Sequence, residues 1–559
     1  MKKVLALIMA FTLVASFAAC GGGGNTGSTG GGSTNTDSTG GSKPTVERDP
    51  SKAKKIVIYT GGSSEFFWSA GTKEQEVWDA VEEAFYNDYA VNVDFQVNFY
   101  GKDMKDKINA ELTAGGQVDV VMSHTGGGDG IDDWMFNNDQ YYDLYDLIDE
   151  YGANIYQYST WTQGDVSLDA LTRLTTFDKQ VVGIPSVINP YKFGILVRKD
   201  LMEAAGYTDD AAKVSEGYKL VDNLETFEEM ALAIVNADPN DDVKYATTGA
   251  IFDLEKAGLL GAYGLDAGYY TSTVDEATET FGAGFMKEGY GDVLELENRW
   301  AKNGVISGEA DTILLSDGEN NFISGKTAIF VQDPSINHLI QVARKAKARN
   351  PEAEFTVLGA LTKDANSTAK GFMRNSVATF AACVSKTSQC AKEIVQFINW
   401  MYEDPANYLL CKYGVEGKHW IDNGDNTYSY ANESDYINPP YSGVLSLVEN
   451  QNVANYTYAG YTEEELSWIA TAQDKSNYID NDTVDYFLLT DNMQMNTELD
   501  TGRRYMYNFC QTQVWSGANI DVKAGFANNR AEYLKAAAYD SENSYGKYMY
   551  QLYKALSGK

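Results

Sequence analysis

Three strand-like stretches near the start of the chain decide its fold: KIVIYT (55–60), VNVDFQVNF (91–99) and VDVVMS (118–123). The first and third are apolar runs, and the second alternates apolar and polar residues. Between them, apolar residues recur at helical spacing over 74–87 and over 104–112. This order of strand, helix, strand, helix and strand predicts a parallel sheet covered by helices.

Further elements follow along the chain. A capping box at Thr226 and Glu229 predicts a helix through Ile234. Asn423-Gly424 predicts the turn of a hairpin over 414–430. The other expected elements are extended runs at 183–198 and 371–384, helices at 200–205, 391–403 and 531–539, and a Tyr-rich helical region after 435.

The N-terminus has the pattern of an export signal. Two lysines precede an apolar run that is too short to span a membrane and that ends in Phe17-Ala-Ala-Cys20. Small residues before this cysteine resemble the lipobox of bacterial lipoproteins, which implies cleavage after residue 19 and lipidation of Cys20. Residues 21–42 are almost entirely Gly, Ser, Thr and Asn, as in a flexible tether. The alternative is a plain signal peptide with an incidental cysteine.

Composition excludes several classes of function. The chain has 559 residues, with 44 Lys+Arg against 79 Asp+Glu, and its formal net charge of −35 argues against nucleic-acid binding. Its 38 Tyr, 23 Phe and 9 Trp suit a wet binding surface. Three His and five Cys are too few for a His-rich metalloenzyme or a disulfide scaffold. The four cysteines after Cys20 allow three pairings, and spacing does not choose among them.

No catalytic or cofactor motif is complete. Residues 238–242 open like a calcium loop, but Val243 and Gly249 occupy the positions of its required glycine and acid. A structural cation within 129–143 is less favoured than a solvated acidic surface. Neither a cofactor nor a metal is therefore expected, and the chain is not expected to be an enzyme. Paired carboxylates for glycoside hydrolysis stay open, because their separation depends on the fold.

Two Gly-rich loops mark the expected binding site. They follow the first and third strands, at 60–68 and 123–134, and each contains Trp. In open α/β sheets, ligands bind beyond the carboxyl ends of the strands. The alternative is that the glycines form turns and the aromatic rings fill gaps in the core.

Several segments together resemble the extracellular solute-binding proteins of ABC importers, the class that includes maltose-binding protein. They are Gly183-Ile-Pro185, Ile195 to Leu201 with Ala204 to Tyr207, Phe322 to Phe330 (FISGKTAIF), the helix 391–403, and Tyr413 to Trp420 (YGVEGKHW). The resemblance implies an α/β, two-lobe fold of the type II periplasmic-binding-protein class, with ligand in the cleft between the lobes. It divides the chain into a signal peptide (1–19), a lipidated cysteine and tether (20–51), lobe one (52–192 and 371–425), and lobe two (193–370) with 426–559 packing on it or spanning both lobes.

The resemblance and the aromatic content together nominate the ligand-binding residues. They are Ser63, Glu65, Phe66 and Trp68 after the first strand, His124, Asp132 and Trp134 after the third, Asp333 after the Gly-Lys segment, Arg374 on the returning segment, and Tyr191 and Trp420 as further aromatics. At Asp333-Pro-Ser335 the maltose-binding branch has Gly-Pro-Trp, so its stacking Trp is absent here.

These observations predict a lipid-anchored protein on the extracellular face of a Gram-positive cell membrane. We expect it to capture an oligosaccharide as a monomer, to close its lobes around it, and to deliver it to the permease subunits of an ABC importer. An exported peptide-binding protein is one alternative. A carbohydrate-degrading enzyme and a surface glycan-binding protein or adhesin are the others.

Overall fold

The structure, a computed structural model, describes most of the chain after the tether. The described residues are 47–61, 70–101, 103–125, 130–176, 178–237, 243–248, 251–268, 271–309, 315–331, 335–436, 439–485, 504–536 and 545–557. The expected signal peptide, Cys20 and the Gly/Ser/Thr-rich run lie outside this part of the chain.

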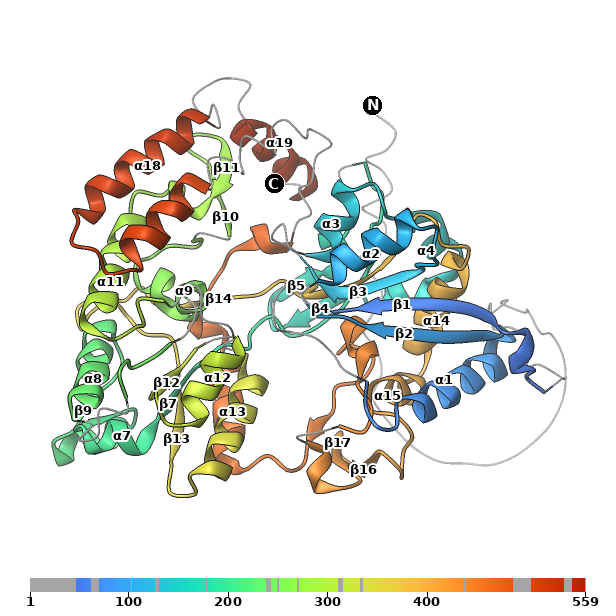
Figure 1. The fold of residues 1–559 in the computed structure, drawn as a ribbon, viewed down its shortest axis with the longest axis horizontal. Helices are drawn as coiled ribbons and strands as arrows, with labels where there is room; N and C mark the ends of the chain where they lie inside the picture. The colour runs from blue at the N-terminus through green and yellow to red at the C-terminus, as the bar shows by residue number, and fades with distance from the viewer. Residues whose placement is uncertain are drawn as a thin grey trace, which may run out of the picture. The chain divides into compact units, whose positions relative to one another are not determined.

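A five-stranded sheet with strand order β2-β1-β3-β15-β6 organises the elements that we call lobe one (Figure 1). Its strands are β1 (Lys54–Thr60), β2 (Val93–Phe99), β3 (Val120–His124), β6 (Ile184–Pro185) and β15 (Phe380–Val384). β1 pairs in parallel with β2 and with β3, which confirms the sheet predicted from the repeated strand and helix pattern. β15 joins antiparallel to β3 and β6 from much later in the chain.

Helices cover both faces of this sheet (Figure 1). They are α1 (Glu74–Tyr89), α2 (Met104–Thr113), α3 (Ile131–Asn137) and α14 (Ala391–Glu403). On one face, Phe85 of α1 meets Phe397 of α14 with ring centroids 5.5 Å apart. On the other, Ile108 of α2 is fully buried in the same cluster as Val57 of β1. A central strand that is buried on both faces needs apolar residues at every position, which explains the unbroken run at 56–59.

Shorter elements complete lobe one. They are α4 (Tyr145–Tyr151), α5 (Ala153–Gln157), β4 (Thr160–Gln163), β5 (Val166–Asp169), α6 (Ala170–Arg173), α15 (Pro405–Tyr413), β16 (Trp420–Gly424), β17 (Thr427–Tyr430) and β18 (Thr457–Tyr458).

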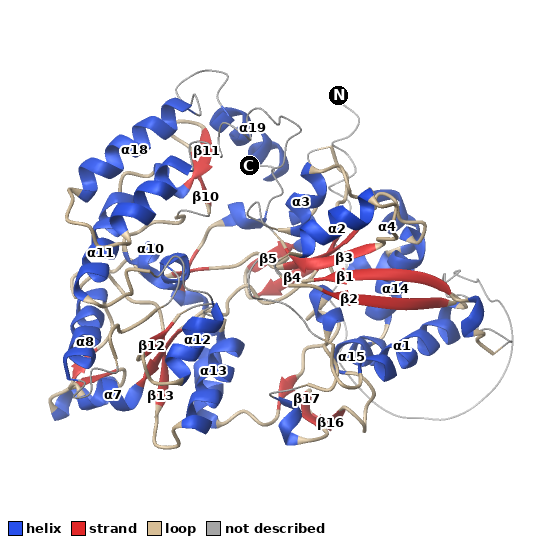
Figure 2. Cartoon of the chain, viewed as in Figure 1, coloured by secondary structure: helices blue, strands red, loops and turns tan. Residues whose placement is uncertain are grey.

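A three-stranded antiparallel sheet, in the order β12-β7-β13, lies among the elements that we call lobe two (Figure 2). Its strands are β7 (Ile195–Arg198), β12 (Ile329–Phe330) and β13 (Phe355–Leu358). The other strands of lobe two are β8 (Tyr207–Thr208), β9 (Lys219–Leu220), β10 (Ser272–Asp275), β11 (Thr280–Ala283), β14 (Phe372–Met373) and β19 (Tyr478–Ile479). Its helices are α7 (Lys199–Ala204), α8 (Leu224–Ala237), α9 (Ile251–Leu254), α10 (Leu260–Ala262), α11 (Tyr290–Asn303), α12 (Leu315–Ile323), α13 (Ile336–Arg349), α16 (Glu463–Gln473), α18 (Val522–Ala536) and α19 (Tyr545–Ser557).

The chain passes between the two sets of elements three times. The first crossing (residues 186–194) leads from β6 to β7, and the second crossing (residues 374–379) leads from β14 to β15. Their backbones are hydrogen-bonded: the N–H of Ile188 donates to the carbonyl of Val377 at 3.2 Å, and that of Asn375 donates to Pro190 at 3.2 Å. The third passage (residues 459–462) leads from β18 to α16. Earlier in the chain, the carbonyl of Glu449 accepts from the N–H of Val187, in the first crossing, at 2.7 Å.

The C-terminal part of the chain contributes to the cores of both lobes. Tyr441 and Val444 are buried with the residues of α1 and α14. Trp468 of α16 is buried with the residues of α13. Farther along, Phe526 of α18 lies 6.0 Å from the ring of Tyr290 on α11. The sequence alone leaves open whether residues 426–559 pack on lobe two or span both lobes.

Two local predictions are wrong, a helix cap by three residues and a hairpin turn by two. Helix α8 begins at Leu224, and the Asn223 carboxamide oxygen accepts from the N–H of Thr226 at 3.0 Å, so Asn223 caps this helix and Thr226 does not. In the β16–β17 hairpin, Asp425 and Asn426 occupy the turn with φ of 53° and 57°. Asp and Asn tolerate this left-handed backbone, so the turn follows Asn423-Gly424.

The cysteines after Cys20 are all buried and free. They are Cys383, Cys390, Cys411 and Cys510. Burial raises the pKa of each thiol, that of Cys390 to about 11, so the thiols resist ionisation at neutral pH. Among the described residues, none of the helices combines the length and the apolar character needed to cross a bilayer.

Candidate ligand-binding site

The carboxyl ends of β1 and β3 lie side by side, as the parallel pairing requires. Thr60 pairs with Met122, and the Ser123 hydroxyl donates to the carbonyl of Gly61 at 2.5 Å. A Cβ at Gly61 would lie 2.2 Å from the carbonyl oxygen of Tyr100, so a side chain does not fit at this position. The loops after both strands therefore start from one edge of the sheet.

The segment after β3 is attached to the second crossing. The backbone N–H of Thr125 donates to the carbonyl of Thr379 at 2.9 Å, and its hydroxyl donates to the carbonyl of Ala378. His124 is partly exposed, with Nδ1 3.3 Å from the Ser123 hydroxyl. Its imidazole is thus placed where lobe one meets a segment that leads to lobe two.

Asp132 and Arg173 form a buried ion pair beside this edge. Their side chains are 0% and 9% exposed, and Arg173 Nη2 lies 2.9 Å from Asp132 Oδ2. Asp132 is in the first turn of α3, and Arg173 ends α6. A carboxylate removed from water requires such a partner. The pair thus joins α3, which carries Trp134, to α6.

Trp134 is half-buried on α3. It packs against the cluster that contains Met135 and Tyr59, and the residue is only partly buried. A partly buried Trp at the carboxyl end of a sheet can offer the open part of its ring to a ligand.

Arg374 and Tyr191 lie on the two crossings, and both are buried. The Arg374 side chain is 1% exposed, and its Nε donates to Asp480 Oδ1 at 3.4 Å, whereas the Asp480 side chain is 91% exposed. The Tyr191 ring contacts Trp161 of β4 at 5.8 Å and Tyr478 of β19 at 4.9 Å.

Trp420 is packed within the β16–β17 region of lobe one. It is buried, its indole N–H donates to the carbonyl of Gly414 at 2.8 Å, and its ring lies 5.7 Å from that of Tyr413. These contacts explain Trp420 as a residue of the core. Its role in ligand contact stays a prediction.

His124 ends β3, and Asp132 and Trp134 lie on the next helix, α3. Thr125 links the end of β3 to the crossing that starts at Arg374. Ser63, Glu65, Phe66, Trp68 and Asp333 lie outside the described residues. Arg173, Thr125 and Trp161 were not predicted from the sequence, because each acts through residues distant in the chain. Within the described ranges, no group of three or more His, Cys, Asp or Glu side chains is arranged to hold a metal ion.

No protein-family profile and no curated protein matches the sequence. Solved structures match along nearly the whole chain. An extracellular solute-binding protein from Bifidobacterium longum subsp. infantis is 14% identical, with a TM-score of 0.61 over 91% of this chain and 99% of that one. The alginate-binding protein AlgQ2 is 15% identical, with a TM-score of 0.60 over 90% and 96%.

A third similar structure is the N-glycan transport solute-binding protein NgtS from Streptococcus pneumoniae. It is 14% identical, with a TM-score of 0.59 over 90% of this chain and 98% of that one. Together with the sheets and crossings described above, these likenesses confirm the predicted fold: an α/β, two-lobe, type II periplasmic-binding-protein-like architecture.

Proposed function

We propose that this chain is an extracellular solute-binding protein that captures an oligosaccharide for an ABC importer. The observation that carries the proposal is the likeness, over about 90% of the chain, to proteins described as alginate-binding and as N-glycan transport proteins. The partly buried Trp134 on α3 and His124 at the end of β3 support a ligand site of the same kind.

The side chains at this edge suit a sugar. Sugar rings have apolar C–H faces and a rim of hydroxyl groups. Flat aromatic rings cover such faces, and His, Asp, Asn or Arg side chains bind the rim through hydrogen bonds. Trp134 is the aromatic platform in this proposal, and His124 is a polar contact. Asp132 acts through its ion pair with Arg173, which holds α3 and its indole in place.

Titration calorimetry with a panel of neutral oligosaccharides and of short peptides tests the ligand class. Losing one stacked aromatic costs roughly 1–3 kcal/mol, so Trp134→Ala should weaken sugar binding about 5- to 150-fold. Tyr145→Ala, which removes a 46% exposed ring on α4, is the matched control and should leave affinity unchanged. Binding of peptides alone, or full sugar affinity in Trp134→Ala, would overturn this assignment.

The protein binds its ligand without transforming it. Incubation of each bound oligosaccharide with the pure protein, followed by mass spectrometry, should return the sugar intact. Accumulation of shorter sugars in proportion to protein concentration would establish a carbohydrate-degrading enzyme instead.

The proposal includes anchoring and delivery. Cys20 is lipidated after removal of residues 1–19, the protein stands on the outer face of the cell membrane as a monomer, and permease subunits receive the sugar. Cys20→Ala should release the protein into the medium and abolish lipid labelling of the chain. Unchanged retention in the membrane fraction would contradict the anchor.

A further inference from the structure

Residues 474–485, which we call the strap, run beside both crossings. The strap contains the short helix η7 (Lys475–Asn477), strand β19 and the short helix η8 (Asp482–Asp485). It follows α16 and pairs with β14, the strand that leads into the second crossing. The resemblance to solute-binding proteins did not assign this segment a role.

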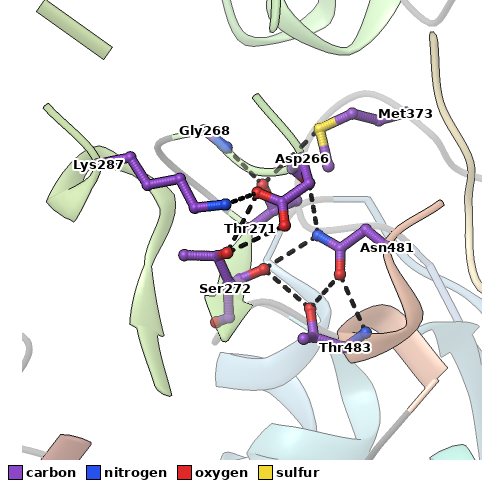
Figure 3. Close-up of polar contacts among 9 residues, drawn as sticks. Asp266, Gly268, Thr271, Ser272, Lys287, Met373, Asn481 and Thr483 are labelled. Atoms are coloured by element: carbon purple, nitrogen blue, oxygen red, sulfur yellow. Dashed lines mark hydrogen bonds and ion pairs between the residues drawn. The ribbon is translucent and has the colours of Figure 1, made fainter. Parts of the chain in front are cut away.

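The strap is attached to lobe two by buried hydrogen bonds (Figure 3). The Asn481 carboxamide N–H groups donate to the carbonyls of Asp266 and Ser272 at 2.6 and 3.0 Å. The Thr483 hydroxyl donates to the same Ser272 carbonyl at 2.8 Å. Asn481 and Thr483 are only 5% and 8% exposed, so breaking these bonds would leave polar groups without water.

The segment of lobe two that accepts these hydrogen bonds, around Asp266, is held by further contacts (Figure 3). The Thr273 hydroxyl lies 3.1 Å from each carboxylate oxygen of Asp266, and Lys287 forms an ion pair with the same carboxylate. β19 adds parallel pairing of Tyr478 with Phe372 and of Ile479 with Met373. We therefore expect the strap to move with lobe two when the lobes change orientation.

Tyr478 holds the strap against both crossings. Its hydroxyl accepts from the backbone N–H of Phe193, in the first crossing, at 2.6 Å and donates to the carbonyl of Ala472 at 2.6 Å. Its ring lies 4.9 Å from Tyr191 and 5.5 Å from Phe372, each in an edge-on arrangement. One side chain thus contacts the segment that leaves lobe one and the strand that leads back to it.

One polar contact of the strap with lobe one lies at the surface, whereas η8 lies beside α6 of lobe one. Lys475 Nζ lies 2.8 Å from Asp165 Oδ1, in the turn between β4 and β5. The two side chains are 46% and 91% exposed, so water can replace each partner when the pair separates. The same hairpin contains Trp161, which packs on Tyr191.

We propose that the strap is a hinge element in addition to the three connections, that Tyr478 locks it to both crossings, and that the Lys475–Asp165 pair is the releasable contact that biases the lobes toward the arrangement of this structure. The proposal rests on the proposed function only in requiring that the lobes change orientation. An exposed ion pair shifts such an equilibrium by about 1.5- to 5-fold at low salt, and screening removes the shift.

Distances between the lobes in ligand-free protein test the proposal. In a Cys20→Ala chain, spin labels at Asn87→Cys on α1 and Ala348→Cys on α13 occupy exposed positions, and the four native thiols are buried. Pulsed electron resonance then gives the distribution of distances. In 20 mM salt, Lys475→Ala should lower the ratio of the population at the distance of this structure to the remaining population by about 1.5- to 5-fold. In 500 mM salt the variant and the parent should agree.

The matched control is Lys523→Ala. Lys523 is 56% exposed and pairs with Asp292 and Glu295 of α11, a partner helix within lobe two, so its loss should leave the distribution unchanged. The exchanged pair Asp165→Lys with Lys475→Asp should restore the parent distribution. Identical distributions for Lys475→Ala and Lys523→Ala, or no recovery in the exchanged pair, would overturn the proposal.

Tyr478→Phe tests the lock and keeps the ring. It removes the acceptor of the Phe193 N–H, so the distribution should broaden beyond the change seen in Lys475→Ala, with the same far-ultraviolet circular dichroism as the parent. An unchanged distribution would contradict the role of Tyr478. Because these measurements need no ligand, a wrong assignment of the sugar does not affect them.

Discussion

The buried carboxylate of Asp132 depends on one cation, Arg173. Arg173→Ala leaves a buried carboxylate without its cation, so we expect the free energy of unfolding to fall by about 3–5 kcal/mol in urea denaturation. The control is Lys386→Ala, because the Lys386–Asp139 pair is 52% and 78% exposed and should contribute about 1 kcal/mol at most. If Arg173→Ala and Lys386→Ala lowered the free energy of unfolding by similar amounts, the buried pair would contribute no more to stability than the exposed one.

Glu297 on α11 is a buried acid of another kind. Its side chain is fully buried, and the Trp515 indole N–H donates to its Oε2 at 2.9 Å. Burial raises the pKa of Glu297 well above its ordinary value of 4.5, and the negative charge of nearby Glu255 raises it further. Cys510 is buried beside both acids, and the Tyr290 hydroxyl donates to Glu255 at 2.5 Å.

The raised pKa of Glu297 predicts the direction of a pH effect. The folded state keeps a proton that the unfolded chain releases above pH 4.5. The stabilisation is therefore complete below that pH and is lost as pH rises toward the pKa in the folded state, by up to about 1.4 kcal/mol per pH unit. Glu297→Gln keeps an acceptor for Trp515 and removes the titration, so its free energy of unfolding should fall less between pH 5 and 8.

Urea denaturation at several pH values measures this difference. Glu464→Gln, at an exposed position of α16, should follow the parent protein across the same range. If Glu297→Gln also follows the parent protein, Glu297 does not hold a proton in the folded state.

At the scale of elements, one carboxylate joins α16 to α13. Glu465 Oε2 accepts from the backbone N–H of Thr462 at 2.8 Å, and the Thr462 hydroxyl accepts from the N–H of Glu465 at 3.1 Å, which completes a capping box. Both Glu465 oxygens also accept from Arg344 of α13 at 2.6 Å. The Arg344 guanidinium lies 4.4 Å from the centre of the Tyr436 ring.

Removing this joint should cost more than removing the cap alone. We expect Thr462→Ala to lower the free energy of unfolding by about 0.5–2 kcal/mol, and Glu465→Ala to lower it by about 2–4 kcal/mol, because the second also breaks the pair with Arg344. The exposed Glu464→Ala should change it by less than about 0.5 kcal/mol. Equal effects of Thr462→Ala and Glu465→Ala in urea denaturation would show that the bond to α13 contributes nothing.

For the whole molecule, ligand binding should draw the lobes together. A ligand that contacts both lobes binds best when they close, so the radius of gyration from small-angle X-ray scattering should decrease when the oligosaccharide is added. At a free concentration of 100 times Kd, the ligand should also raise the free energy of unfolding by about 2.7 kcal/mol. Binding without any change in the scattering radius would indicate a rigid protein.

The position of the candidate site was predictable, and the state of its side chains was not. Parallel pairing of the strands at 55–60 and 118–123 places their carboxyl ends at one edge, a rule that needs only the order of elements. Trp134 and Trp420 have the same chemistry in the sequence, yet Trp134 is only partly buried at this edge and Trp420 is enclosed beside Gly414. Exposure depends on which distant residues pack around each ring, and spacing in the chain does not encode this.

By itself, the amino-acid sequence determined the β-α-β-α-β order, the apolar strands and helices such as 391–403, and the two-lobe fold that its motifs resemble. Periodicity carries this information, because the face that a residue presents depends on its near neighbours in the chain. Only the tertiary structure decided the antiparallel entry of β15, the pairing of Asp132 with Arg173, and the course of the strap along both crossings. These contacts join residues far apart in sequence, and they form only when several elements are packed at once, so no local pattern specifies them.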